Sequence, residues 1–147
     1  MQISSPAFGP KGAIPAKYTC DGENINPELN FHEIPEGAQS LALVVDDPDA
    51  PAGTWDHWLV YNIPPDSSGI DEGRPNIGKQ GKTSFGNNKY GGPCPPDGEH
   101  RYFFKLYALD VMLELDPDDA TKDGLLAAME GHILEETELV GKYDRSL

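Results

Sequence analysis

The sequence has little positive charge. It contains 11 Lys and Arg residues against 25 Asp and Glu residues, which gives a net charge of −14 with histidine neutral. A protein this acidic repels nucleic-acid phosphates and anionic membrane surfaces. We therefore expect no nucleic-acid partner. The simplest role of the acidity is solubility, and any anionic ligand must be captured locally, against the field of the whole protein.

Long apolar runs are also absent. The longest aliphatic run is residues 41–45, LALVV, far short of the roughly 20 residues that cross a bilayer. The first ten residues, MQISSPAFGP, have neither the basic start nor the apolar core of a signal peptide. These two features predict no membrane span and a cytoplasmic location.

Cysteine is scarce. Cys20 and Cys94 lie 74 positions apart and match neither a CxxC motif nor a zinc-binding spacing. In a reducing cytosol we expect both to be free thiols, and a disulfide between them stays open as the alternative.

Glycine and proline are abundant. The 16 glycines and 14 prolines make up about a fifth of the 147 residues, against roughly 12% in an average protein. This composition favours many short strands and loops over a helical bundle. The length predicts a single domain, residues 1–147.

Hydrophobic patterning predicts a mostly β protein with antiparallel strands in two sheets. The strands are expected at residues 29–34, 40–45, 55–63 and 102–109. If the last strand starts two residues earlier, His100 shares a face with Tyr102. Period-two alternation in the third strand places one set of side chains on a common face: Trp55, His57, Leu59, Tyr61 and Ile63.

The C-terminal part predicts one helix followed by a closing strand. Thr121 is a candidate N-cap, and Gly131 is suited to the position after the helix. We interpret residues 133–143 as a strand because Thr137, Leu139 and Val140 lie beyond the glycine.

Two short clusters could carry chemistry. Residues 46–51, DDPDAP, follow a buried strand, and their prolines hold the neighbouring carboxylates in fixed directions. A polar turn that ends a strand is the simpler interpretation. In residues 54–58, TWDHW, the indole of Trp55 could wall a pocket that holds the His57 imidazole, although a core histidine bonded to backbone is equally consistent.

The third cluster is residues 90–102, YGGPCPPDGEHRY. Its glycines would let backbone N–H groups approach an anion, and His100 and Tyr102 supply further donors. Arg101 is expected to have a structural role, with Asp47 or Asp49 as its carboxylate partner.

Two catalytic alternatives use the same residues. Asp47, His57 and His100 make a two-histidine, one-carboxylate set that could bind a metal ion. Cys94 could act as the nucleophile of a hydrolase, although no motif supplies it with a base.

The clusters together resemble the phosphatidylethanolamine-binding protein family. The resemblance covers nearly the whole chain and rests on residues 46–64, DDPDAPAGTWDHWLVYNIP, and 91–110, GGPCPPDGEHRYFFKLYALD. Residues 18–31, YTCDGENINPELNF, and 131–145, GHILEETELVGKYDR, are similar to its prokaryotic YbhB/YbcL, or Raf-kinase-inhibitor-like, branch.

The resemblance implies a large central antiparallel sheet flanked by a smaller one, with a short helix near the C-terminus. It implies a non-catalytic protein without cofactor or metal, with a pocket for a small anion such as phosphate or a phosphorylethanolamine head group. A kinase or protease partner and a homodimer are also implied. The ligand-binding residues carried over are Asp47, Pro48, Asp49, Trp55, His57, Gly92, Pro93, His100 and Tyr102, with Arg101 and Pro51 structural beside them.

Overall fold

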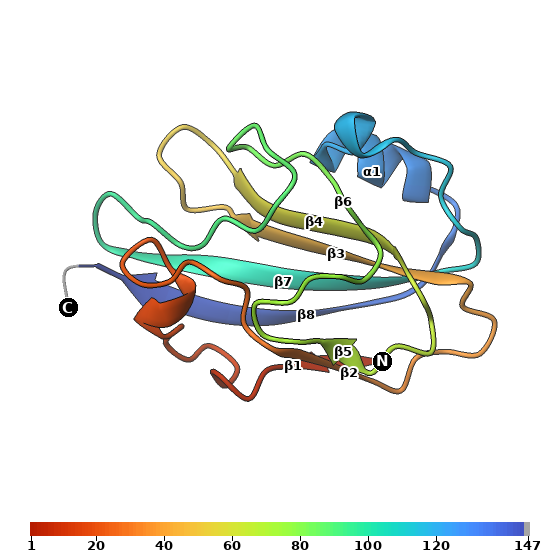
Figure 1. Ribbon diagram of the computed structural model, residues 1–147, viewed down its shortest axis with the longest axis horizontal. Coiled ribbons are helices and arrows are strands. Elements are labelled where there is room, and N and C mark those ends of the chain that lie inside the picture. The colour runs from red at the N-terminus through yellow and green to blue at the C-terminus, as the bar shows by residue number, and fades with distance from the viewer. Residues whose placement is uncertain (146–147) are drawn as a thin grey trace.

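A computed structural model describes residues 1–145, which form two antiparallel sheets and one α-helix (Figure 1). The five-stranded sheet has the order β6-β4-β3-β7-β8, with strands Lys79–Gln80, Trp55–Ile63, Ser40–Asp47, Glu99–Leu109 and Ile133–Asp144. The three-stranded sheet has the order β1-β2-β5, with strands Gln2–Ser4, Leu29–His32 and Gly69–Ile70. Helix α1 is Lys122–Met129, and short 3-10 helices are Ala16–Tyr18 and Pro117–Asp119.

Strand β3 lies at the centre of the molecule. All eight of its residues are buried, as expected for a β-branched, apolar run between two packed layers. Leu41, Leu43 and Val45 face the core shared with the small sheet, whereas Ala42 and Val44 face α1. Figure 1 shows the small sheet and α1 on opposite sides of the large sheet. The predicted mostly β fold with two sheets and one helix is therefore confirmed.

Strands β7 and β8 pair along their whole length, from Glu99 opposite Asp144 to Leu109 opposite Ile133. The earlier start of β7 is confirmed, because its even-numbered residues are buried from His100 onward. The closing strand and the helix are also confirmed. Thr121 caps α1 by accepting a hydrogen bond from the Gly124 N–H, and Gly131 has a φ of 82°.

Strand β4 departs from the predicted alternation. Val45 pairs with Trp58 but Asp46 pairs with Asp56, so His57 is the extra residue of a β-bulge. A second irregularity follows near Asn62, whose φ is 54°. The expectation of one shared face is therefore wrong. Leu59 and Tyr61 pack with α1, whereas Ile63 packs in the core under the small sheet.

The expectation of free cysteines is wrong, because Cys20 and Cys94 form a disulfide. Their Cα atoms lie 5.5 Å apart, within the range that a disulfide needs. The Cys20 N–H donates to the Pro93 carbonyl at 3.1 Å, so the two segments also meet through backbone.

Within residues 1–145, no helix has the length and apolar character needed to cross a membrane.

The helix cap provides a test of this local structure. Thr121→Ala removes the acceptor for the Gly124 N–H, so the free energy of unfolding should fall by about 1 kcal/mol. Thr121→Ser keeps a hydroxyl acceptor and should stay close to wild type. Urea denaturation of the three proteins measures both effects. Equal losses in the two variants would contradict the assignment of the cap.

Candidate functional site

A cavity of about 220 Å³ opens at the end of the large sheet where β3 ends and β4 and β7 begin. The loops that follow β3 and precede β7 form its walls. The residues that line it are Asp47, Ala50, Pro51, Trp55, His57, Phe85, Cys94, Pro95, Pro96, His100 and Tyr102. Two stretches far apart in the sequence therefore meet in one hollow.

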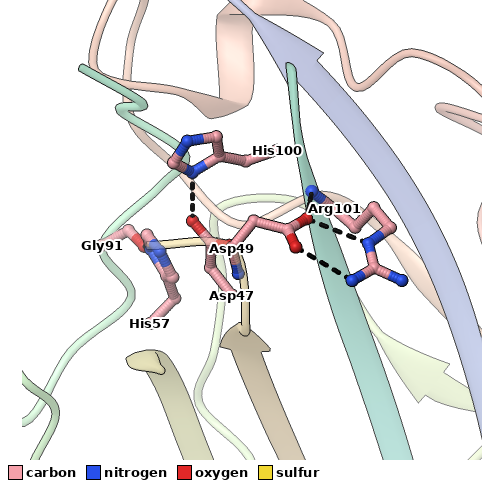
Figure 2. Close-up of polar contacts among 6 residues, drawn as sticks. All are labelled: Asp47, Asp49, His57, Gly91, His100 and Arg101. Carbon is pink, nitrogen blue, oxygen red and sulfur yellow. Dashed lines mark hydrogen bonds and ion pairs between the residues drawn. The ribbon is translucent and has the colours of Figure 1, made fainter. Parts of the chain in front are cut away.

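Asp47 and His100 form the buried polar centre of the cavity (Figure 2). The His100 Nδ1–H donates to Asp47 Oδ2 at 2.7 Å, and Asp47 Oδ1 accepts from the Asp49 N–H at 2.8 Å. Asp47 is only 2% exposed, so each carboxylate oxygen needs such a donor. The carboxylate fixes the proton on Nδ1 of His100 and leaves Nε2 for another partner.

His57 is held by backbone rather than by a carboxylate. Its Nδ1–H donates to the Gly91 carbonyl at 2.7 Å, and the Gly91 N–H donates to the His57 carbonyl at 3.1 Å. Its ring meets those of Tyr102 and Phe85 edge-on, with centroids 5.2 and 5.5 Å away. Burial lowers the pKa of His57 from its ordinary value of 6.5, so this imidazole is neutral at pH 7.

Tyr102 adds a hydroxyl donor. It is 1% exposed, and burial together with the negative charge of Asp47 raises the pKa of its phenol. The hydroxyl therefore stays protonated across the neutral range, and a hydrogen bond to the Asp47 side chain contributes to this shift.

Asp49 and Arg101 lie beside the cavity and do not line it. Asp49 accepts from the Arg101 backbone N–H, Nε and Nη2, each at 2.9 Å. The guanidinium holds the pKa of Asp49 down at about 2. Asp49 is one of the two carboxylates named above as partners for Arg101, and the contact ties the loop after β3 to β7.

The glycine-rich loop has a different role from the one predicted. The Gly92 N–H donates to Asn24 Oδ1 at 2.8 Å, the Gly91 N–H is bonded to His57, and Pro93 has no N–H. The expectation that these groups bind an anion is therefore wrong. Glycine serves close packing instead, because a Cβ on Gly92 would lie 2.2 Å from the Tyr18 carbonyl oxygen.

The remaining predicted residues divide by position. Trp55 and Pro51 line the cavity, whereas Pro48, Gly92 and Pro93 do not. Phe85 is a wall residue that sequence reasoning missed. It meets Trp55 edge-on with centroids 5.4 Å apart, and the two rings remain 43% and 38% exposed. They form an aromatic rim on the cavity.

The described residues lack the geometry that the two catalytic alternatives, a metal site and a Cys94 nucleophile, would need. Among residues 1–145, no three His, Cys, Asp or Glu side chains are grouped to hold a metal ion, so Asp47, His57 and His100 do not form a ligand set. Cys94 is in a disulfide and offers no thiolate, so its role as a hydrolase nucleophile is not available in this state.

The chain is similar to known proteins along nearly its whole length. It is 52% identical over 151 residues to a UPF0098 protein of Methanothermobacter thermautotrophicus, with 99% of both chains covered. It is 48% identical over 151 residues to a UPF0098 protein of Chlamydia pneumoniae, covering 99% of this chain and 100% of the relative.

Solved structures agree with these relatives. A putative phosphatidylethanolamine-binding protein homologue from Chlamydia trachomatis superposes with a TM-score of 0.94 at 46% identity, covering 98% and 97% of the two chains. YbcL of E. coli, called a new member of the mammalian PEBP family, gives a TM-score of 0.89 at 28% identity, covering 97% of each chain. The phosphatidylethanolamine-binding protein model matches residues 4–144. The chain therefore belongs to the phosphatidylethanolamine-binding protein family.

Proposed function

We propose that the cavity binds a small oxyanion, either phosphate or the phosphoryl group of a head group such as phosphorylethanolamine. The observation that carries the proposal is the convergence of His57, His100 and Tyr102 on one hollow. Both imidazoles use Nδ1 within the protein, so Nε2 of each ring is available to a ligand, and the Tyr102 hydroxyl lies in the same lining.

The proposed binding is coupled to protons. A neutral imidazole with its proton on Nδ1 has only a lone pair at Nε2 and cannot donate to an anion there. The oxyanion must therefore arrive with a proton of its own, or an imidazole must take one up. Among the residues that the structure describes, no Lys or Arg lines the cavity, so no fixed cation there replaces that proton. Binding should strengthen as the pH falls.

The rim favours a ligand with a substituent. The cavity exceeds the roughly 30 Å³ that one water occupies in the liquid, so it has room for a small polyatomic group. Trp55 and Phe85 stand at its exposed side and provide apolar contact for whatever the phosphoryl group carries. A phosphomonoester would use both parts of the site.

The proposal is confined to this small ligand. A kinase or protease partner rests on the resemblance alone, because no contact among residues 1–145 argues for one. The absence of catalysis, the cytoplasmic location and the homodimer stay predictions.

The titration of His57 tests the proton coupling. In an NMR pH titration without ligand, the His57 imidazole should show its midpoint below pH 6.5, because burial disfavours its charged form. Saturating phosphate should move that midpoint upward. The unfolded chain binds this proton near pH 6.5 and the folded chain only at lower pH, so stability should fall as the pH drops below 6.5. A midpoint that phosphate leaves in place would contradict the coupling.

His100→Gln tests the ligand contact. Glutamine can still donate to Asp47 but has no ring nitrogen to donate to an oxyanion, so phosphate affinity at pH 5.5 should fall by about tenfold. His132→Gln is the matched control, because His132 pairs with Asp110 at the other end of β7 and should leave binding unchanged. Amide chemical shifts measure affinity for inorganic phosphate and for phosphorylethanolamine. Equal affinities in wild type and His100→Gln would overturn the assignment.

A further inference from the structure

The disulfide lies in the wall of the cavity and joins two exposed residues. Cys94 lines the cavity, and both Cys20 and Cys94 are exposed residues. Most structural disulfides resist reduction, whereas exposed ones are the labile ones, because a thiolate must reach a sulfur to attack it. Because this disulfide forms part of the cavity wall, its oxidation or reduction should affect the ligand site.

The segment 94–98 depends on the disulfide for its attachment. This segment supplies Cys94, Pro95 and Pro96 to the cavity wall. Within the described part of the chain, none of its residues has a hydrogen bond, and its two prolines have no N–H to donate. Apart from packing, the bond to Cys20 is what fixes this wall between Pro93 and the start of β7.

The preceding part of the loop is held independently. The Gly92 N–H is bonded to Asn24, the Tyr90 hydroxyl donates to the Tyr18 carbonyl at 2.7 Å, and Pro93 accepts from Cys20. These hydrogen bonds remain when the disulfide opens. Reduction should therefore loosen one wall of the cavity while the sheets and both histidines keep their places.

We propose that the Cys20–Cys94 disulfide is a thiol-exchange site that controls the ligand cavity. The oxidised disulfide holds the wall formed by residues 94–98 in place, and reduction loosens that wall. The proposal rests on the proposed function. A thiolate of a low-molecular-weight thiol attacks one sulfur, the S–S bond breaks, and its electron pair leaves on the other sulfur as a thiolate. A second thiol then attacks the mixed disulfide. Two thiols are oxidised to one external disulfide, and the protein gains two thiols.

The first experiment tests exchange without reference to any ligand. Folded wild-type protein is treated with millimolar dithiothreitol, which is mostly neutral at pH 7 and so is not excluded by the net charge of −14. Free thiols are counted over time while NMR monitors the fold. Two thiols should appear within minutes to hours with the sheet signals retained. Thiols that appear only in urea would overturn the exchange site.

The second experiment tests control of the cavity. Affinity for inorganic phosphate is measured for oxidised wild type, for wild type in dithiothreitol, and for Cys20→Ser. Cys20 is outside the cavity lining, so this variant opens the link and leaves Cys94 in place. Reduction should weaken binding by about fivefold or more. Cys20→Ser should bind as weakly and ignore dithiothreitol.

The outcomes separate the two proposals. If oxidised wild type binds phosphate and reduction or Cys20→Ser leaves the affinity unchanged, the control is wrong and the oxyanion site stands. If oxidised wild type binds no phosphate, the proposal of an oxyanion site is wrong, and so is the proposal that the disulfide controls that site. The proposal of thiol exchange is then still decided by the thiol count. Reciprocally, bound phosphate should slow reduction, because a ligand that prefers the oxidised form stabilises it.

Discussion

The hydrogen bond between Asp47 and His100 is the interaction on which the site depends. It joins the last residue of β3 to the second residue of β7 inside the protein, at 2.7 Å. A buried carboxylate without donors would be costly, so the pair keeps the ends of the two strands together. Through its other oxygen Asp47 also positions the Asp49 backbone, and Asp49 in turn clamps Arg101. The Asp47 carboxylate thus sets both the orientation of an imidazole, through Oδ2, and the course of the loop that walls the cavity, through Oδ1.

His57, the second imidazole, is placed in the cavity by a β-bulge rather than by a carboxylate partner. The bulge at His57 gives β4 an extra residue opposite β3, and the side chain turns toward Tyr102. Two reciprocal hydrogen bonds with Gly91 then fix the ring and its proton. The two histidines therefore differ in chemistry, since one faces a carboxylate and the other faces a carbonyl.

Alternating patterns predicted much of this architecture. The buried residues from His100 to Ala108 follow period two, and Thr121 and Gly131 mark the ends of α1 by local preference alone. Alternation also separates the two adjacent aspartates. Asp47 faces the cavity, whereas Asp46 faces the other side and is neutralised by Lys105 and Lys122 at 3.2 and 2.7 Å.

Features that depend on tertiary contact could not be predicted in this way. No feature of the local sequence marks His57 as the site of a β-bulge, because the period-two pattern predicted for residues 55–63 runs through it. The pairing of Cys20 with Cys94 joins segments 74 residues apart, and the wall position of Phe85 depends on the long loop around it. The glycines of residues 91–92 suggested an anion nest, but tertiary partners had already taken their N–H groups. The residue types therefore indicated which chemical groups the site contains, but they did not indicate which partners those groups contact in the folded protein.

A crystal structure of the oxidised protein grown or soaked in phosphate near pH 5.5 tests the central claim most directly. The account predicts one tetrahedral anion in the cavity, within hydrogen-bond distance of Nε2 of His57, Nε2 of His100 and the Tyr102 hydroxyl. A cavity that holds only water, in crystals saturated with phosphate, would contradict it.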